Sequence, residues 1–322
     1  MTQNRVSEIL NIKYPIISAA MWGLTNAKMV AAVSDAGGLG VLGPMPGQKP
    51  SNGLDEAGEV MREQIREVKT LTDKPFAVNI IADDSGANSG ISSDLFAVYL
   101  DVMIEEKVPV ALVVGHLSNH EFFDKLQKNN IKIIYRPNEA DPKLIKQAEE
   151  MGLDAIIATG LDEGGGLPIN PWLAGTFSVV PRFVDEATIP VIAAGGITDG
   201  RTAKAAVDLG AEGLYIGTRF LVTNESPLAE NVKDLIVKSK LEDLVYLPDP
   251  TSETIRAIKT PKLPEIIKRI SSGQISGTST LLNGMLKGDL DNGTVVTDTG
   301  LSLIHSVKSV KEVIDELKVA FE

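Results

Sequence analysis

The sequence of 322 residues contains no cysteine and only three histidines. The lack of cysteine excludes disulfides, thiolate metal sites and cysteine nucleophiles. Of the histidines at positions 116, 120 and 305, only His116 and His120 have the i, i+4 spacing of a helical metal site. Because these two flank a predicted loop, we expect no metal site.

Positive charge is also scarce. The chain has 31 lysines and arginines against 43 aspartates and glutamates, which gives a formal net charge of −12. Binding to a phosphate backbone needs a basic face, so we expect no nucleic-acid partner. The one basic stretch has the pattern of a solvated helix surface and consists of Lys259, Lys262, Lys268 and Arg269.

Long hydrophobic runs are missing as well. The longest apolar run, residues 108–114, is far shorter than the roughly 20 residues that a helix needs to cross a bilayer. Residues 1–11 are polar and mixed, without the charged and apolar parts of a signal peptide. We therefore expect no membrane partner and a cytoplasmic location.

What the sequence does have is a repeated alternation of short apolar runs and longer helical patterns. The runs are rich in β-branched residues and predict strands at 14–19, 40–43, 76–81, 110–114, 131–135, 155–159, 190–194 and 213–217. The patterns between them predict helices at 27–36, 54–71, 95–106, 121–128, 142–151, 179–186 and 201–209. Eight strand–helix repeats predict a (β/α)8 TIM barrel.

An open doubly wound sheet is the alternative architecture. Such a sheet has a glycine-rich turn after its first strand, whereas this chain has Ala20-Met21-Trp22-Gly23 there. The glycine-rich turns come late in the sequence instead, and this placement favours the barrel.

The regular alternation stops after Phe220. Residues 224–300 mix helical and turn-rich stretches and predict a small C-terminal lid or subdomain, with the barrel formed by 1–223 and 301–322. The stretch 307–321 predicts an amphipathic helix docked on the barrel, with the apolar residues Val310, Val313, Ile314, Leu317 and Val319.

Two glycine turns follow the last two predicted strands. They are Gly195-Gly196-Ile197-Thr198-Asp199-Gly200 and Gly217-Thr218-Arg219, and each leads into a helical pattern. Barrels commonly hold a phosphate in the loops after strands seven and eight, where backbone N–H groups and helix N-termini face the anion. These turns therefore predict a phosphate site, although glycines also occur in turns that bind nothing.

Several motifs resemble the nitronate monooxygenase (2-nitropropane dioxygenase) family, whose close relative is the flavin-dependent enoyl-acyl-carrier-protein reductase. The similar segments are 14–21, 31–40, 78–80, 193–201, 217–221 with Glu225-Ser226, 287–301 and 310–314. The resemblance covers nearly the whole chain and implies an FMN-dependent oxidoreductase that oxidises alkyl nitronates with O2. It also implies a small-molecule substrate, while a homodimer stays open.

The resemblance also implies which residues bind FMN. Ala20 and Met21 would line the flavin ring, Asn79 would hydrogen-bond it, and Thr159 and Gly164 would border it. The phosphate would be held by Gly195, Gly196, Tyr215, Ile216, Gly217 and Thr218.

The chain departs from the family in the loop after the sixth strand. The family has a histidine there that acts as acid or base, and this chain has Gly166. Two other residues are candidates for the proton chemistry, namely His116 after the fourth strand and Glu163 in the altered loop, with Asp162 beside it. Arg136, after the fifth strand, is a candidate for placing positive charge near the flavin.

Two other functions stay open. One is an NAD(P)H-dependent flavin reductase of the enoyl-acyl-carrier-protein reductase or quinone reductase type. The missing histidine weighs against reduction of an enoyl group, which needs a proton donor, and the acidic chain would repel an acidic carrier protein. The other is a flavin- or phosphate-binding protein without turnover.

Overall fold

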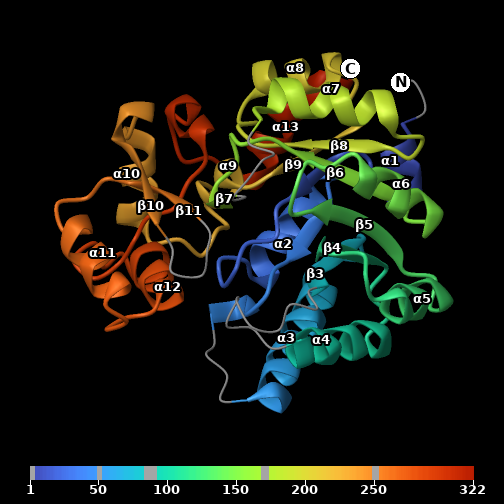
Figure 1. Cartoon of the computed structure of the whole chain (residues 1–322), viewed down its shortest axis with the longest axis horizontal. Coiled ribbons are helices and arrows are strands. Elements are labelled where there is room, and N and C mark those ends of the chain that lie inside the picture. Colours follow the sequence, from blue (N-terminus) through green and yellow to red (C-terminus); the bar gives the residue numbers. More distant parts are fainter. Residues whose placement is uncertain (1–3, 49–52, 83–92, 168–173, 249–253) are drawn as a thin grey trace.

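Eight parallel strands form the centre of the structure, a computed structural model that describes residues 4–48, 53–82, 93–167, 174–248 and 254–322 (Figure 1). The strands are β1 (Ile16–Ser18), β2 (Gly40–Leu42), β3 (Phe76–Ala82), β4 (Val110–Gly115), β5 (Lys132–Pro137), β6 (Ala155–Thr159), β8 (Val191–Ala194) and β9 (Gly213–Ile216). Their order is β1-β9-β8-β6-β5-β4-β3-β2, and a parallel bridge between Ile17 and Leu39 joins the two ends. The predicted (β/α)8 barrel is confirmed.

The inside of the barrel is packed with side chains. Alternate residues of a strand point to the same face, and those on the inner face form one apolar cluster. The cluster includes Ile17, Leu39, Val41, Leu112, Ile134, Ile157 and Ile192, together with Val6 and Leu10 of α1 (Arg5–Leu10). Helix α1 thus adds its apolar residues to the core inside the barrel.

The helices between the strands cover the outside of the barrel. They are α2 (Ala27–Asp35), α3 (Leu54–Leu71), α4 (Ser93–Glu105), α5 (His120–Lys128), α6 (Lys143–Glu150), α7 (Thr176–Glu186) and α8 (Gly200–Asp208). Helix α3 buries Ala57, Met61, Ile65 and Val68, which recur at the spacing of one helical face. All seven helices predicted between the strands are present.

Helix α13 (Val310–Leu317) docks on the barrel through Val310, Val313, Ile314 and Leu317. The Ser309 side chain accepts a hydrogen bond from the N–H of Glu312 and begins the helix. The prediction that Val319 belongs to this apolar face was wrong. Val319 lies in the short 3-10 helix η4 (Lys318–Phe321), where the change of helix type leaves it 48% exposed.

A second group of elements lies at one side of the barrel (Figure 1). It contains α10 (Glu230–Lys238), η2 (Leu241–Asp243), β10 (Leu244–Pro248), β11 (Thr254–Ile258), α11 (Leu263–Ser271) and α12 (Gly277–Lys287). Val232, Ile236, Ile258 and Met285 share an apolar cluster there. That residues 224–300 form a lid stays a prediction.

A short strand in the loop after β6 pairs with a strand of this second group. Strand β7 (Gly165–Leu167) follows β6 and pairs antiparallel with β11, with Gly166 opposite Ile255. No strand is predicted here from the sequence, because Gly-Gly-Leu has low strand propensity and its partner is about 90 positions away. The remaining short helices are η1 (Pro46–Gln48), α9 (Thr218–Leu221) and η3 (Thr299–Leu303).

Candidate active site

The two glycine turns lie side by side at the carboxyl ends of β8 and β9. These strands are neighbours, with Ala194 opposite Tyr215. Gly195 and Gly196 have φ values of +103° and +68°, which side chains rarely adopt. A Cβ on Gly195 would also lie 2.9 Å from the carbonyl oxygen of Gly160, so the turn requires glycine.

The turns leave backbone donors available. Within the described parts of the chain, the N–H groups of Gly196 and Gly217 have no acceptor. Two N–H groups in the first turn of α8 are already used, because those of Arg201 and Thr202 each donate to the Asp199 carboxylate at 3.0 Å. The turns themselves therefore offer N–H groups to an anion, while Asp199 already occupies two of those at the start of α8.

The chain returns to these turns near its carboxyl end. The N–H of Asp298 donates to the Thr218 hydroxyl at 3.0 Å, and the N–H of Thr299 donates to the Asp162 carbonyl at 3.1 Å. A Cβ on Gly300 would lie 3.1 Å from the Gly196 carbonyl oxygen. Residues 298–300 thus lie next to both turns, a role that the sequence analysis missed.

Two carboxylates border the turns. Asp162 accepts hydrogen bonds from the N–H and hydroxyl of Thr176 at 2.8 and 2.9 Å, and its Cβ would lie 3.1 Å from a Cβ on Gly196. The Asp298 side chain is only 5% exposed and accepts a hydrogen bond from the N–H of Gly300 at 2.8 Å. Burial raises the pKa of Asp298 to about 6, although the hydrogen bonds from Thr218 and Gly300 act to lower this pKa.

The arginine of the second turn does not serve an anion. Arg219 is 3% exposed, and its guanidinium donates to the carbonyls of Val222 at 3.0 Å and Ser306 at 3.2 Å. Burial lowers its pKa. The Arg219 guanidinium therefore links the main chain of Val222 to that of Ser306.

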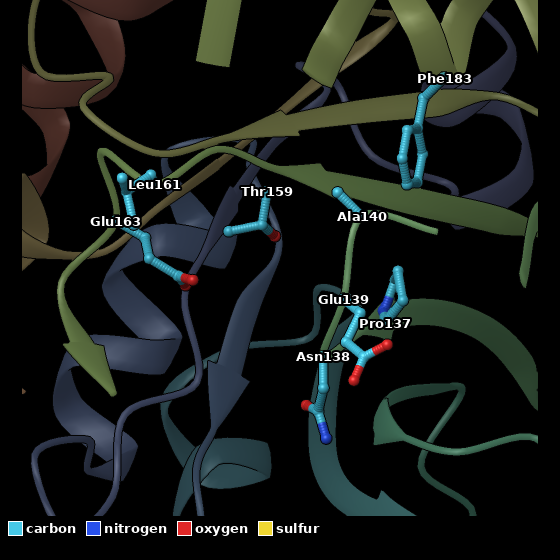
Figure 2. Close-up of a pocket in the computed structure, with 8 residues that line it drawn as sticks. All are labelled: Pro137, Asn138, Glu139, Ala140, Thr159, Leu161, Glu163 and Phe183. Atoms are coloured by element: carbon cyan, nitrogen blue, oxygen red, sulfur yellow. The ribbon is translucent and has the colours of Figure 1, made fainter. Parts of the chain in front are cut away.

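A cavity at the barrel mouth lies between the loop after β6 and the segment after β5. Figure 2 shows Thr159, Leu161 and Glu163 on one side and residues 137–140 on the other, with Phe183 also lining the cavity. The Thr159 hydroxyl is buried, and no described residue hydrogen-bonds it. An unpartnered buried hydroxyl is unfavourable, so a ligand that bonds Thr159 would offset this cost.

Glu163 forms an ion pair with Arg136 at this mouth. The two side chains are 13% and 19% exposed, and Glu163 Oε2 accepts from Arg136 Nη2. Arg136 comes from the end of β5 and Glu163 from the loop after β6, which are adjacent strands. The structure thus brings together two residues that the sequence analysis singled out separately.

Tyr215, which is predicted to hold the phosphate, contacts Ala20, which is predicted to line the flavin ring. Its side chain is 8% exposed, and its hydroxyl accepts a hydrogen bond from the N–H of Ala20 at 2.8 Å. Burial raises the pKa of Tyr215, while the nearby Arg136 acts against this rise. Met21 packs against the same apolar cluster as Tyr215, inside the barrel.

The other predicted residues occupy separate positions. Asn79 is 3% exposed and donates through Nδ2 to the Leu112 carbonyl at 2.8 Å. Gly164 packs against Thr297 and Asp298, because a Cβ there would lie 2.9 Å from the Asp298 nitrogen. His116 follows β4 and has an exposed side chain. Its backbone N–H donates to the carbonyl of Ala82.

Arg256 of β11 contacts the loop after β6 at this mouth, and no motif in the sequence pointed to it. It is 1% exposed and donates to the carbonyls of Leu161, at 2.8 Å, and Glu163. Its guanidinium also lies 5.2 Å from the centre of the Tyr246 ring. A single arginine in a strand pattern carries no local signal of such contacts, which join residues about 95 positions apart.

The described residues contain neither a metal-binding cluster nor a helix suited to cross a membrane. None of the clusters of histidine, aspartate or glutamate in these ranges has three members placed to hold a metal ion. Among the helices in the described part of the chain, none combines the length and apolar character that crossing a membrane requires.

Comparisons with known proteins show which family the chain belongs to. The family model described as nitronate monooxygenase matches residues 3–319. A protein of Staphylococcus aureus (strain JH9) named "Probable nitronate monooxygenase" is 32% identical over 300 residues, covering 82% of this chain and 80% of that protein.

Solved structures give the same picture. FabK from Thermotoga maritima is 32% identical, with a TM-score of 0.84 and coverage of 100% of this chain and 96% of that chain. A nitroalkane oxidase from Streptomyces ansochromogenes is 22% identical and shares the fold, with a TM-score of 0.78 and coverage of 98% and 99%. The chain belongs to the nitronate monooxygenase family and is a flavin-dependent oxidoreductase.

Proposed function

We propose that this protein uses FMN to oxidise alkyl nitronates with O2. The observation that carries the proposal is the pair of adjacent glycine turns, whose Gly196 and Gly217 N–H groups have no acceptor in the described part of the chain. A single phosphate group matches these donors. FMN has one phosphate, whereas FAD needs room for a second phosphate and an adenosine, and no dinucleotide fingerprint is present.

The residues at the other end of the proposed site also fit a flavin. Thr159 has a buried hydroxyl without a partner among the described residues, and a ring atom of the cofactor would supply one. Ala20 and Met21 lie at the mouth, held by the bond from the Ala20 N–H to Tyr215. We propose Asn79 and Gly164 as further residues at the ring end.

Bound flavin would supply a two-electron acceptor that O2 can reoxidise. The side chains of the protein position the substrate and hold charge. Arg136 pairs its guanidinium with the Glu163 carboxylate at the mouth, so the two side chains together carry no net charge where a nitronate would enter.

A nitronate also explains why the family histidine is dispensable here. The substrate has already lost its proton, so its oxidation needs little help from a base. Gly166 lies in β7, paired with β11, where the family histidine is expected. We propose Glu163 as the residue that serves any remaining proton transfer, with His116 as the alternative.

Reduction by NAD(P)H is the second candidate function. It is favoured by the similarity to FabK from Thermotoga maritima, which covers 100% of this chain. The absence of a histidine at position 166 favours the nitronate reaction instead. Gly166 is also the feature that supports the third candidate, a flavin-binding protein without turnover.

Substrate class, location and oligomeric state are also part of the proposal. We propose a small-molecule substrate, a cytoplasmic location and a homodimer as the oligomeric state to test first. Size-exclusion chromatography with light scattering would measure the last of these, and a monomeric mass would overturn it.

The experiment that tests the function is a comparison of two activities of the purified protein. Oxygen consumption is measured with an alkyl nitronate, and NADH consumption is measured separately with a quinone or an enoyl thioester. The proposal expects nitronate-dependent oxygen consumption. NADH consumption without any nitronate reaction would establish the reductase instead. If the protein binds flavin but shows neither activity, the result would support a flavin-binding protein without turnover.

A further inference from the structure

The Asp298 carboxyl occupies an unusual place for a negative charge. Its main-chain N–H donates to the hydroxyl of Thr218, a residue of the second glycine turn. Its Oδ1 atom and the Gly196 carbonyl oxygen both lie 3.1 Å from the position that a Cβ on Gly300 would take. The carboxyl is therefore buried against the two turns that we propose for the cofactor phosphate.

Groups from three other elements act on this carboxyl. Arg256 of β11 favours its ionised form, and Asp162 from the loop after β6 opposes it. Thr218 of α9 hydrogen-bonds it, and so does the N–H of Gly300. Asp162 is committed elsewhere, because it accepts from Thr176 at the start of α7.

A phosphate dianion in the turns would add like charge beside these carboxylates. Two like charges a few ångström apart in a buried site repel strongly, and a carboxyl relieves this repulsion by taking up a proton. Burial already raises the pKa of Asp298 to about 6 before any phosphate is bound. A protonated carboxyl can also donate a hydrogen bond to a phosphate oxygen.

We propose that Asp298 is protonated whenever a phosphate monoester occupies the two glycine turns, so that cofactor binding takes up a proton from solvent. The inference rests on the proposed FMN site and adds a regulatory property to it. The proton balance is one proton taken up per phosphate bound at a pH where the free carboxyl is ionised. Binding of FMN then weakens as the pH rises.

The test measures the dissociation constant of FMN from cofactor-free full-length protein between pH 5 and 8.5, by quenching of flavin fluorescence. The wild type is compared with Asp298→Asn, which keeps the shape and removes the titration. Above about pH 6 we expect the wild-type constant to rise relative to the variant by up to about tenfold per pH unit. Riboflavin, which lacks the phosphate, should show no such difference between the two proteins.

The phosphate of FMN titrates near the same pH, with a second pKa of about 6. This titration is common to both proteins and cancels in the ratio of their constants. Parallel pH profiles for wild type and Asp298→Asn would overturn the inference while leaving the FMN site intact. Failure of both proteins to bind FMN at any pH would overturn the proposed cofactor and this inference together.

A second measurement needs no variant. Proton uptake on adding FMN to the wild type is followed at pH 8 with an indicator dye in weak buffer, where free FMN is a dianion. We expect uptake approaching one proton per FMN bound. Binding of FMN without proton uptake would overturn the inference even if Asp298→Asn fails to fold.

Discussion

The guanidinium of Arg256 donates a hydrogen bond to the carbonyl of Leu161 at 2.8 Å. Arg256 lies in β11 of the second group of elements, and Leu161 lies in the loop after β6 at the barrel mouth. A second bond reaches the carbonyl of Glu163, the partner of Arg136. One buried side chain thus attaches the second group to the loop that shapes the proposed active site.

Replacing this residue tests the attachment. Arg256→Met should lower the free energy of unfolding by about 2–4 kcal/mol, because two carbonyls lose a charged donor in a buried site. The control is Arg66→Met, since Arg66 is 64% exposed and its pair with Glu106 should contribute less than about 1 kcal/mol. Urea unfolding measures both, and equal effects would contradict the structural role of Arg256.

The first glycine turn is tested by adding a carboxylate. Gly196→Asp should abolish FMN retention, because the new group would occupy the turn and repel the phosphate. Gly273→Asp is the matched control, since Gly273 has a similar φ of +71° and open space around it. Flavin content after purification is the measurement, and a Gly196→Asp protein with full flavin content would refute the phosphate site.

The buried Asp298 predicts how stability depends on pH. Its folded pKa of about 6 lies above the unfolded value near 3.8, so the folded state binds more protons between these values. Its contribution to stability is therefore fully present below about pH 4 and is lost as the pH rises through about 6.

The Asp298→Asn substitution removes this pH-dependent loss of folding stability. In cofactor-free protein the variant should be more stable than the wild type by about 1–3 kcal/mol at pH 7.5, and the advantage should shrink towards pH 4. Urea unfolding of both proteins at several pH values in phosphate-free buffer measures the difference. A constant difference at every pH would show that Asp298 does not titrate as expected.

The two candidates for proton transfer predict different outcomes. Glu163 lines the cavity and is paired with Arg136, whereas His116 is exposed. We expect Glu163→Gln to lower kcat/KM for a nitronate by about 100-fold or more, within the range for loss of a positioned acid or base. His116→Ala should change kcat/KM by less than about twofold, as expected for a group outside the reaction.

The pH profile of kcat/KM separates these cases further. If His116 is the proton carrier, the large loss of kcat/KM moves to His116→Ala, and the pH profile of that variant differs from the wild type. Unchanged rates at every pH in His116→Ala would leave Glu163 as the candidate.

Much of the barrel could be predicted from the sequence because each strand carries its own local signal. The runs at 110–114 and 155–159 are apolar and β-branched, and helical patterns of adequate length separate them. The two late glycine turns could be found for the same reason, since Gly195-Gly196 and Gly217 directly follow predicted strands.

The other half of the site depends on contacts between distant residues. Thr218 and Asp298 are 80 positions apart, and Leu161 and Arg256 are 95 apart. Neither segment has a periodic pattern that points to the other. Strand β7 was missed because pairing with β11, and not its own composition, makes Gly165–Leu167 a strand.

The proposed FMN-dependent oxidation of nitronates is tested most directly by an anaerobic absorbance titration. The purified protein is examined for bound flavin, identified as FMN by its mass after release, and an alkyl nitronate is then added without oxygen. We predict bleaching of the flavin by the nitronate and its return when O2 is admitted. A protein that takes up no FMN, or one whose flavin is bleached by NADH alone, would contradict the proposed function.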